Sequence, residues 1–92
     1  MWQDVYLQKL AKSGDVATGV VRQFCDTFGF IWLMAVDDIR AGIHNPIMNR
    51  SVFVHQSDIE TVGFRSLESG TPVEFRIALG ERGFKAVNVR PF

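Results

Sequence analysis

Five short segments of alternating character constrain the fold of this chain more than any other feature. They are VATGVVRQF, FGFIWLM, SVFVHQS, TPVEFRIAL and FKAVNVR, and residues typical of turns separate them. Their β-branched and aromatic residues recur with a period of two, which is typical of β-strands. Five short strands in a chain of 92 residues favour a small barrel or sandwich over a helical or parallel-sheet fold. We therefore expect one all-β domain with a single core.

The N-terminal segment has a different pattern. Its apolar residues at helical spacing are Trp2, Val5, Tyr6 and Leu10. This spacing predicts a helix, and the glycine of KSGD ends it. We expect residues 1–15 to form a short helical extension of a domain that spans residues 16–92. The pattern leaves open whether this extension packs on the domain, is flexible or contacts another chain.

The connection between the second and third strands is unusually long. It covers residues 34–50 and contains DDIRAGIHNP, which has no clear periodicity. Long loops without structure are uncommon in compact domains and are usually functional or mobile. We expect a long loop at residues 34–50, which is either an insertion or part of a binding surface. Within it, we expect His44 to be solvated.

Charge and reactive residues exclude several classes of function. Ten basic and ten acidic side chains cancel, so no strong overall field draws the chain to nucleic acid or anionic membrane. The single Cys25 can form no internal disulfide, and one pair of histidines argues against a structural zinc site.

The sequence also gives no sign of catalysis. No nucleophilic side chain has a general base placed beside it, so we expect no enzyme and no cofactor. No segment resembles a signal peptide or a membrane span, which predicts a cytoplasmic protein, with a nuclear location as the alternative.

The second and third strands carry aromatic residues on the face that should meet water. Alternate side chains of a strand point to opposite faces. The residues suited to a core are Ile31, Val52 and Val54, and those on the opposite face are Phe28, Phe30, Phe53 and His55. If the two strands pair, the four rings form one patch. Gly29, between two of these rings, indicates a curved or closely approached backbone.

Such a patch needs a partner. Burying a large apolar side chain contributes about 1.5–3 kcal/mol, so a soluble domain keeps a cluster of rings exposed when something docks on it. Unpaired nucleobases fit, because each stacks on an aromatic face for roughly 1–3 kcal/mol. The pattern leaves two alternatives open. The patch could be covered by the N-terminal segment or a second subunit, or it could bind a protein.

Several segments, taken in order, resemble the cold-shock domain. They are GVVRQF, FGFI, VFVHQS, GFRSLESGTPVEF and GERGFKAVNV, at residues 19–24, 28–31, 52–57, 63–75 and 80–89. VFVHQS and GFRSL in this order and spacing are the specific parts. The long connection and HQS are closer to eukaryotic, Y-box-type domains than to compact bacterial ones. The resemblance implies a small five-stranded antiparallel OB-fold barrel.

The resemblance also implies a ligand and a set of binding residues. The ligand is single-stranded RNA or DNA, with RNA expected ahead of DNA, and the implied roles are RNA chaperoning or control of translation and mRNA stability. The residues that occupy the family's base-stacking positions are Phe28, Phe30, Phe53 and His55. We add to the candidate nucleic-acid-binding residues Arg22, Trp32, Gln56 and Phe64.

The chain departs from the family pattern near its first hairpin. Gln23 stands where the family has a tryptophan, which removes a stacking ring, whereas Arg22 keeps a positive charge for a phosphate contact. Only three residues separate Phe24 from Phe28, where the family has five, so the hairpin is tighter and a lysine is lost. These losses predict weaker binding than in a typical family member. Trp32 can compensate, because alternation places it on the same face as Phe28.

The departures support a second hypothesis. In this alternative, the chain is a diverged cold-shock-like barrel that serves as a protein-interaction module within a complex. Neutral charge, the short hairpin and the apolar N-terminal segment are compatible with it. The N-terminal segment would then contact a protein partner or a second copy of the chain. A helix lying across Phe28 and Phe53 would favour this alternative.

Overall fold

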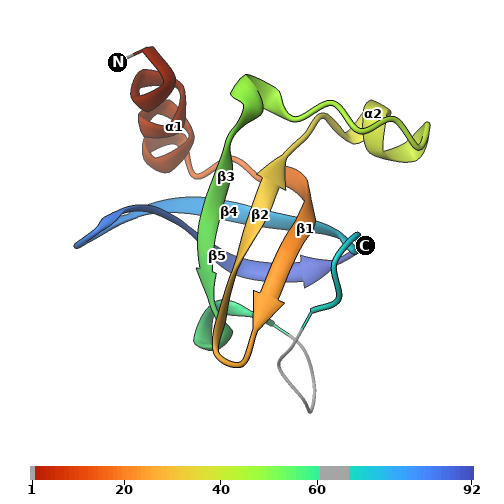
Figure 1. Ribbon diagram of the computed structural model, residues 1–92. Helices are drawn as coiled ribbons and strands as arrows, with labels where there is room; N and C mark the ends of the chain where they lie inside the picture. Colours follow the sequence, from red (N-terminus) through yellow and green to blue (C-terminus); the bar gives the residue numbers. More distant parts are fainter. Residues whose placement is uncertain (1, 61–66) are drawn as a thin grey trace.

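The five alternating segments form the strands of a closed β-barrel (Figure 1). The computed structural model describes residues 2–60 and 67–92. The strands are β1 (Ala17–Cys25), β2 (Phe28–Leu33), β3 (Ser51–His55), β4 (Pro72–Gly80) and β5 (Gly83–Pro91). The predicted all-β barrel of five short strands is thereby confirmed.

The barrel closes through one parallel pairing. Its strand order is β1-β2-β3-β5-β4. Among the named strands of the described chain, every pairing is antiparallel except that of β3 with β5, where Phe53 lies opposite Lys85 and Val54 opposite Ala86. A closed ring with an odd number of strands cannot alternate in direction at every step. The expected antiparallel barrel therefore holds everywhere except at this pair.

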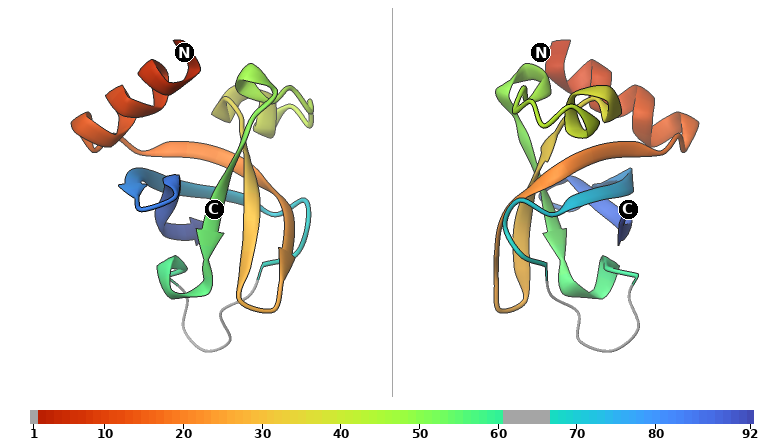
Figure 2. Two further views of the ribbon diagram at one scale, coloured as in Figure 1. Left: turned by 60° about the vertical axis from the view of Figure 1, so that its left-hand side comes forward. Right: turned by 90° about the vertical axis from the view of Figure 1, so that its right-hand side faces the viewer.

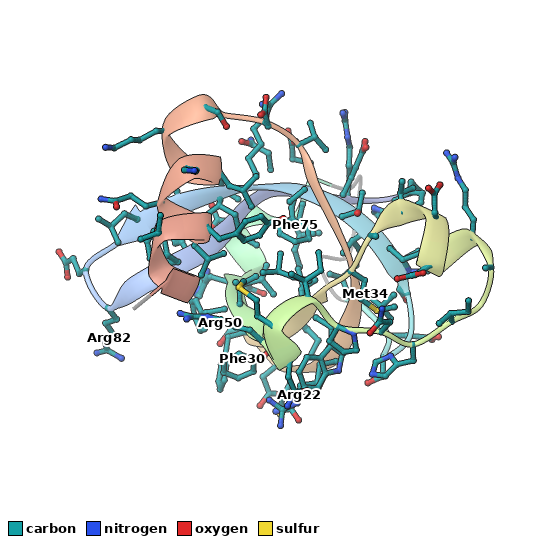
Figure 3. All side chains as sticks on the ribbon, turned by 90° about the horizontal axis from the view of Figure 1, so that it is seen from above. Arg22, Phe30, Met34, Arg50, Phe75 and Arg82 are labelled. Atoms are coloured by element: carbon teal, nitrogen blue, oxygen red, sulfur yellow. The ribbon has the colours of Figure 1, made fainter. Side chains whose placement is uncertain are left out.

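Side chains that alternate inward fill the barrel. The buried apolar side chains of the strands are Ala17, Val21, Ile31, Leu33, Val52, Val54, Val73, Phe75, Ile77, Ala86 and Val89. This set includes the three residues predicted for the core from β2 and β3. Phe75 is the largest fully buried side chain, and Figure 3 shows it inside the barrel. Burial of each large apolar side chain contributes about 1.5–3 kcal/mol, which makes this core the main source of stability.

A β-bulge in β1 changes which side chains face outward. The register with β2 shifts between Val21 and Gln23, so Arg22 is an extra residue without a partner in the ladder. As a result Arg22 and Gln23 are both exposed, and Phe24 packs against the core. Strict alternation from Val21 would have buried Gln23 instead.

The N-terminal segment forms helix α1 (Trp2–Ser13), as its spacing predicts. Leu7 is completely buried, and Leu10 and Ala11 are partly buried against the same core. Gly14 has a φ of 70° and its N–H donates to the Leu10 carbonyl, an arrangement that ends a helix with a left-handed glycine. The Arg76 guanidinium of β4 donates to the Gly14 carbonyl. Of the three arrangements left open, the structure has the helix packed on the barrel.

The segment between β2 and β3 is more ordered than the expected loop. It contains helix α2 (Val36–Arg40) and the 3₁₀ helix η1 (Ile47–Asn49). Both are too short for periodicity to reveal them. Asp37 in the first turn and Arg40 in the last turn of α2 complement the helix dipole. Helices α1, α2 and η1 lie at one end of the barrel, and the β1–β2 turn lies at the other end (Figures 1 and 2).

Membrane insertion through a helix finds no support in the described residues. None of the helices formed by residues 2–60 and 67–92 is both long and apolar enough to cross a bilayer.

We predict that Leu7→Ala lowers the free energy of unfolding by about 2–4 kcal/mol, because it leaves a cavity where α1 meets the barrel. Urea unfolding followed by circular dichroism measures this change. Val5→Ala is the matched control, since Val5 lies on the same helix and is 50% exposed. It should change the free energy of unfolding by less than about 0.5 kcal/mol. Equal effects of the two substitutions would contradict the packing of α1.

Candidate nucleic-acid interface

The pairing of β2 with β3 gathers three phenylalanine rings on the outer face of the barrel. Phe30 lies directly opposite Phe53, and Phe28 lies opposite His55. The Phe28 and Phe53 rings are stacked, with centroids 5.9 Å apart and an angle of 25° between planes. Phe30 meets both rings edge to face, at 6.3 Å from Phe28 and 6.0 Å from Phe53. We call these three rings the aromatic platform.

The aromatic platform is open to solvent on the described structure. Phe28 is 42% exposed and Phe53 is 36% exposed. Helix α1 packs against β4 at one end of the barrel and does not lie across these rings. The covered patch that the sequence left open, with the N-terminal segment over Phe28 and Phe53, is therefore not what the chain forms. Each exposed ring offers a face on which a base can stack.

Gly29 allows the strands beneath the platform to approach closely. A Cβ atom at Gly29 would lie 2.3 Å from the Gln23 carbonyl oxygen and 2.8 Å from the Phe24 Cα. Both are backbone atoms of β1, so no side-chain movement can make room. The interpretation of Gly29 as a site of close backbone approach is correct. This approach brings β1 beneath the two rings that flank the glycine.

His55 is held by the turn that follows β3. Its Nδ1 accepts a hydrogen bond from the Ser57 N–H at 3.1 Å, and the Ser57 Oγ lies 2.9 Å from the same nitrogen. Because Nδ1 is an acceptor, the neutral imidazole carries its proton on Nε2. The half-buried ring lies opposite Phe28 in the β2–β3 register. It can therefore present both a ring and an N–H donor beside the platform.

Arg22 and Trp32 interact with each other at the edge of the same face. Trp32 pairs with Val20 on one side and Ser51 on the other. It is half-buried between the buried Ile31 and Leu33, so it lies on the outer side of β2. The Arg22 guanidinium carbon lies 5.1 Å from the centroid of the Trp32 ring, a cation–π contact. In Figure 3, Arg22 and Phe30 project outward on the same side of the barrel.

His44 contacts Trp32 although it lies in the segment between β2 and β3. It is exposed, but its ring packs edge to face against Trp32, with centroids 6.0 Å apart and an angle of 83° between planes. The expected solvation of His44 agrees with its exposure, and the contact with Trp32 is an addition that the expectation did not include. The folded segment between β2 and β3 brings His44 back to β2, and no local pattern in the sequence indicates this contact.

Of the last two predicted site residues, Gln56 and Phe64, the structure describes only Gln56. Gln56 begins the 3₁₀ helix η2 (Gln56–Asp58), and its backbone N–H donates to the Thr27 carbonyl at 2.7 Å. This bond ties the β1–β2 turn to the end of β3, so Gln56 lies beside the platform and is partly buried. Phe64 lies outside the described residues.

The barrel adds residues that the sequence pattern did not select. A row across four strands contains Gln23, Phe30, Phe53 and Lys85 in register. Lys85 arrives through the parallel β3–β5 pair, which no local pattern predicts. Its Nζ lies 3.8 Å from Asp58 Oδ2, an ion pair exposed enough to add little stability. Phe53 also lines a groove of about 710 Å³ along the β4–β5 hairpin, which carries Arg82 at its turn (Figure 3).

The described residues offer no metal site, since no group of three or more His, Cys, Asp or Glu side chains in residues 2–60 and 67–92 could hold an ion. The face is instead built of rings with a few cations at its edges. Such a surface suits stacking and isolated phosphate contacts.

Sequence comparison assigns this barrel to a family. The family model described as "'Cold-shock' DNA-binding domain" matches residues 42–92, more than half of the chain. The chain belongs to the cold-shock domain family. This family binds nucleic acid and is not enzymatic. The resemblance seen in the sequence is thereby confirmed.

Relatives occur in bacteria and in eukaryotes. Major cold shock protein CspA of Bacillus cereus is 43% identical over 74 residues, 78% of this chain and 91% of that protein. Cold shock-like protein CspA of Stigmatella aurantiaca is 36% identical over 75 residues, 82% of this chain and 96% of that protein. Protein lin-28 homolog B of Xenopus laevis is 40% identical over 62 residues, 67% of this chain but 23% of that protein. The chain thus spans nearly the whole of the bacterial relatives and about a quarter of the Xenopus protein. The similar identities leave the closer relationship to eukaryotic domains a prediction.

We predict that Gly29→Ala lowers the free energy of unfolding by about 1–3 kcal/mol, because the new methyl group clashes with the backbone of β1. Urea unfolding measures the loss. The matched control is Gly80→Ala, since a Cβ there would meet its nearest atoms at 3.4 Å, an ordinary contact. The control should cost less than about 1 kcal/mol. A Gly29→Ala protein as stable as the control would show that β1 and β2 are farther apart in solution.

Proposed function

We propose that the chain binds single-stranded nucleic acid by stacking unpaired bases on the aromatic platform, with RNA as the preferred ligand. The observation that carries the proposal is the cluster of three mutually contacting rings on β2 and β3, of which Phe28 and Phe53 are exposed and Phe30 is half-buried. Membership of a nucleic-acid-binding family supports it. Phe28, Phe30 and Phe53 supply the stacking surfaces, and His55 extends them at the β3 end.

Stacking also determines the kind of specificity. Every base has a π-face, so aromatic platforms tolerate many sequences, and each stacked base contributes roughly 1–3 kcal/mol. The described face has few fixed polar groups that could read base edges. His55 Nε2–H and the Gln23 side chain are the groups best placed to do so. We therefore propose binding with weak sequence preference.

The preference for RNA follows from which strands are unpaired in cells. A platform of rings needs bases that are out of a duplex, and RNA offers them in loops, bulges and ends. The role that we propose is post-transcriptional. By holding bases unstacked from one another, the domain would act as an RNA chaperone or regulate the RNA that it occupies.

We predict that Phe53→Ala weakens binding of a uridine-rich single strand by at least about tenfold, because Phe53 contacts both other rings of the platform. Fluorescence anisotropy of a labelled oligonucleotide measures the affinity. Phe92→Ala is the matched control, since Phe92 is also an exposed phenylalanine and the C-terminus lies on the opposite side of the barrel (Figure 2). The Phe92→Ala chain should bind the uridine-rich strand with the same affinity as the unsubstituted chain. Unchanged affinity in the Phe53→Ala chain would refute stacking on the platform.

We predict a shallow salt dependence. Each phosphate neutralised on a single strand adds about 0.7 to the slope of log affinity against log salt. The net charge is zero, and the cations that we place at the edges of the platform are Arg22 and Lys85. The slope should therefore have a magnitude of about 0.7–1.5 in a titration from low to moderate salt. A magnitude above about 3 would mean that phosphate contacts, rather than stacking, provide most of the affinity.

A further inference from the structure

Trp32 continues the line of outward rings along β2. Phe28, Phe30 and Trp32 occupy alternate positions of one strand, and the rise along a strand puts alternate residues about 6.7 Å apart. The centroids of Phe28 and Phe30 are 6.3 Å apart. The line therefore extends past the platform toward the end of the barrel that carries α2 and η1 (Figure 1). A strand stacked on the platform would meet Trp32 if it ran along β2 in this direction.

Arg22 brings a positive charge to this position. Arg22 is exposed at the bulge in β1, and its guanidinium lies over the Trp32 ring. Within residues 2–60 and 67–92, the guanidinium makes no hydrogen bond or ion pair. A guanidinium packed on an aromatic face keeps its N–H donors in its own plane, where they are available to an anion.

His44 supplies another ring from a different part of the chain. It lies in the connection between β2 and β3, and its exposed ring contacts Trp32 edge to face. The next residue, Asn45, donates a hydrogen bond from Nδ2 to Asp38 Oδ2 of α2 at 3.3 Å. This bond links the His44 turn to α2, so His44 does not reach Trp32 from an unsupported loop.

We propose that Trp32, Arg22 and His44 form an additional nucleotide site that holds the next nucleotide of a single strand beyond Phe30. This inference rests on the proposed function, because it extends the same strand. The base packs against the His44 and Trp32 rings, and its phosphate accepts hydrogen bonds from the Arg22 guanidinium. His44, from the segment between β2 and β3, thereby joins the binding surface, and its ring offsets part of the loss of a ring at Gln23.

The site predicts that affinity depends on strand length. A thymidine trinucleotide can be accommodated by the platform alone, whereas a hexanucleotide can reach Trp32 as well. His44→Ala and Arg22→Ala should each weaken hexanucleotide binding by about fivefold or more, the effect of losing one weak stacking or phosphate contact. The trinucleotide affinity of the His44→Ala chain should change by less than about twofold, whereas Arg22→Ala should weaken both strands, because Arg22 also lies at the edge of the platform. Both affinities are measured by NMR titration of the full chain.

The same titration gives a direct signal from the site. The hexanucleotide should shift the indole Nε1–H resonance of Trp32, and the trinucleotide should leave it in place. Trp2 is the other tryptophan of the chain, so the Trp2→Phe variant assigns the resonance. His44 is exposed, so its removal should leave the fold intact. Matched controls from the same segment are Arg40→Ala, which removes a charge of the same kind, and Ile43→Ala, which truncates an exposed neighbour.

Each outcome distinguishes the site from the platform. Unchanged hexanucleotide affinity in the His44→Ala and Arg22→Ala chains would overturn the additional site while leaving the platform intact. Equal losses for both strand lengths in the His44→Ala chain would also overturn it, because His44 would then act on the fold as a whole. The two control variants could also lose as much hexanucleotide affinity as the site variants. That result would mean a general effect of the segment and would overturn the additional site. Absence of binding by the unsubstituted chain to either strand would instead refute the proposed function.

Discussion

The antiparallel pairing of β2 with β3 is the constraint on which the binding face depends. Alternate residues of the two strands point into the core, where Ile31 lies opposite Val52. The residues between them point outward, where Phe30 lies opposite Phe53. A slip of one residue would send the rings inward and the valines outward, at the cost of the core. The hydrophobic interior therefore holds the platform in register. Gly29 adds the close approach of β1, which a side chain of any size would prevent.

The barrel separates stability from binding. The inner faces of the strands and one face of α1 share a single core, so they carry most of the folding free energy. The outer face of β2 and β3 is left free to expose rings that contribute little to the core. Contacts between these rings partly compensate for that exposure, because each ring covers some of its neighbour and aromatic pairs attract at these separations.

The cations of the face are held by local partners. Arg22 lies on Trp32, and Lys85 lies near Asp58. In a chain without net charge, this arrangement leaves stacking as the main source of affinity and phosphate contacts as a minor one. The bulge in β1 lies at Arg22, and it turns Gln23 outward beside this positive charge.

The sequence alone was sufficient to predict the features that depend on residues close together in the chain. Period-two alternation identified the strands, the core side of β2 and β3 and the outward rings, because consecutive side chains of a regular strand point to opposite faces. The spacing of apolar residues identified α1, and Gly29 marked a close approach of backbones.

Only the tertiary structure decided the features that depend on contacts between residues far apart in the chain. Closure of an odd-numbered ring pairs β3 with β5 and brings Lys85 beside Phe53. Packing of Leu7 determines that α1 covers an end of the barrel and leaves the rings open. The folded connection that places His44 against Trp32 leaves no periodic signal, because its helices are only a turn or so long.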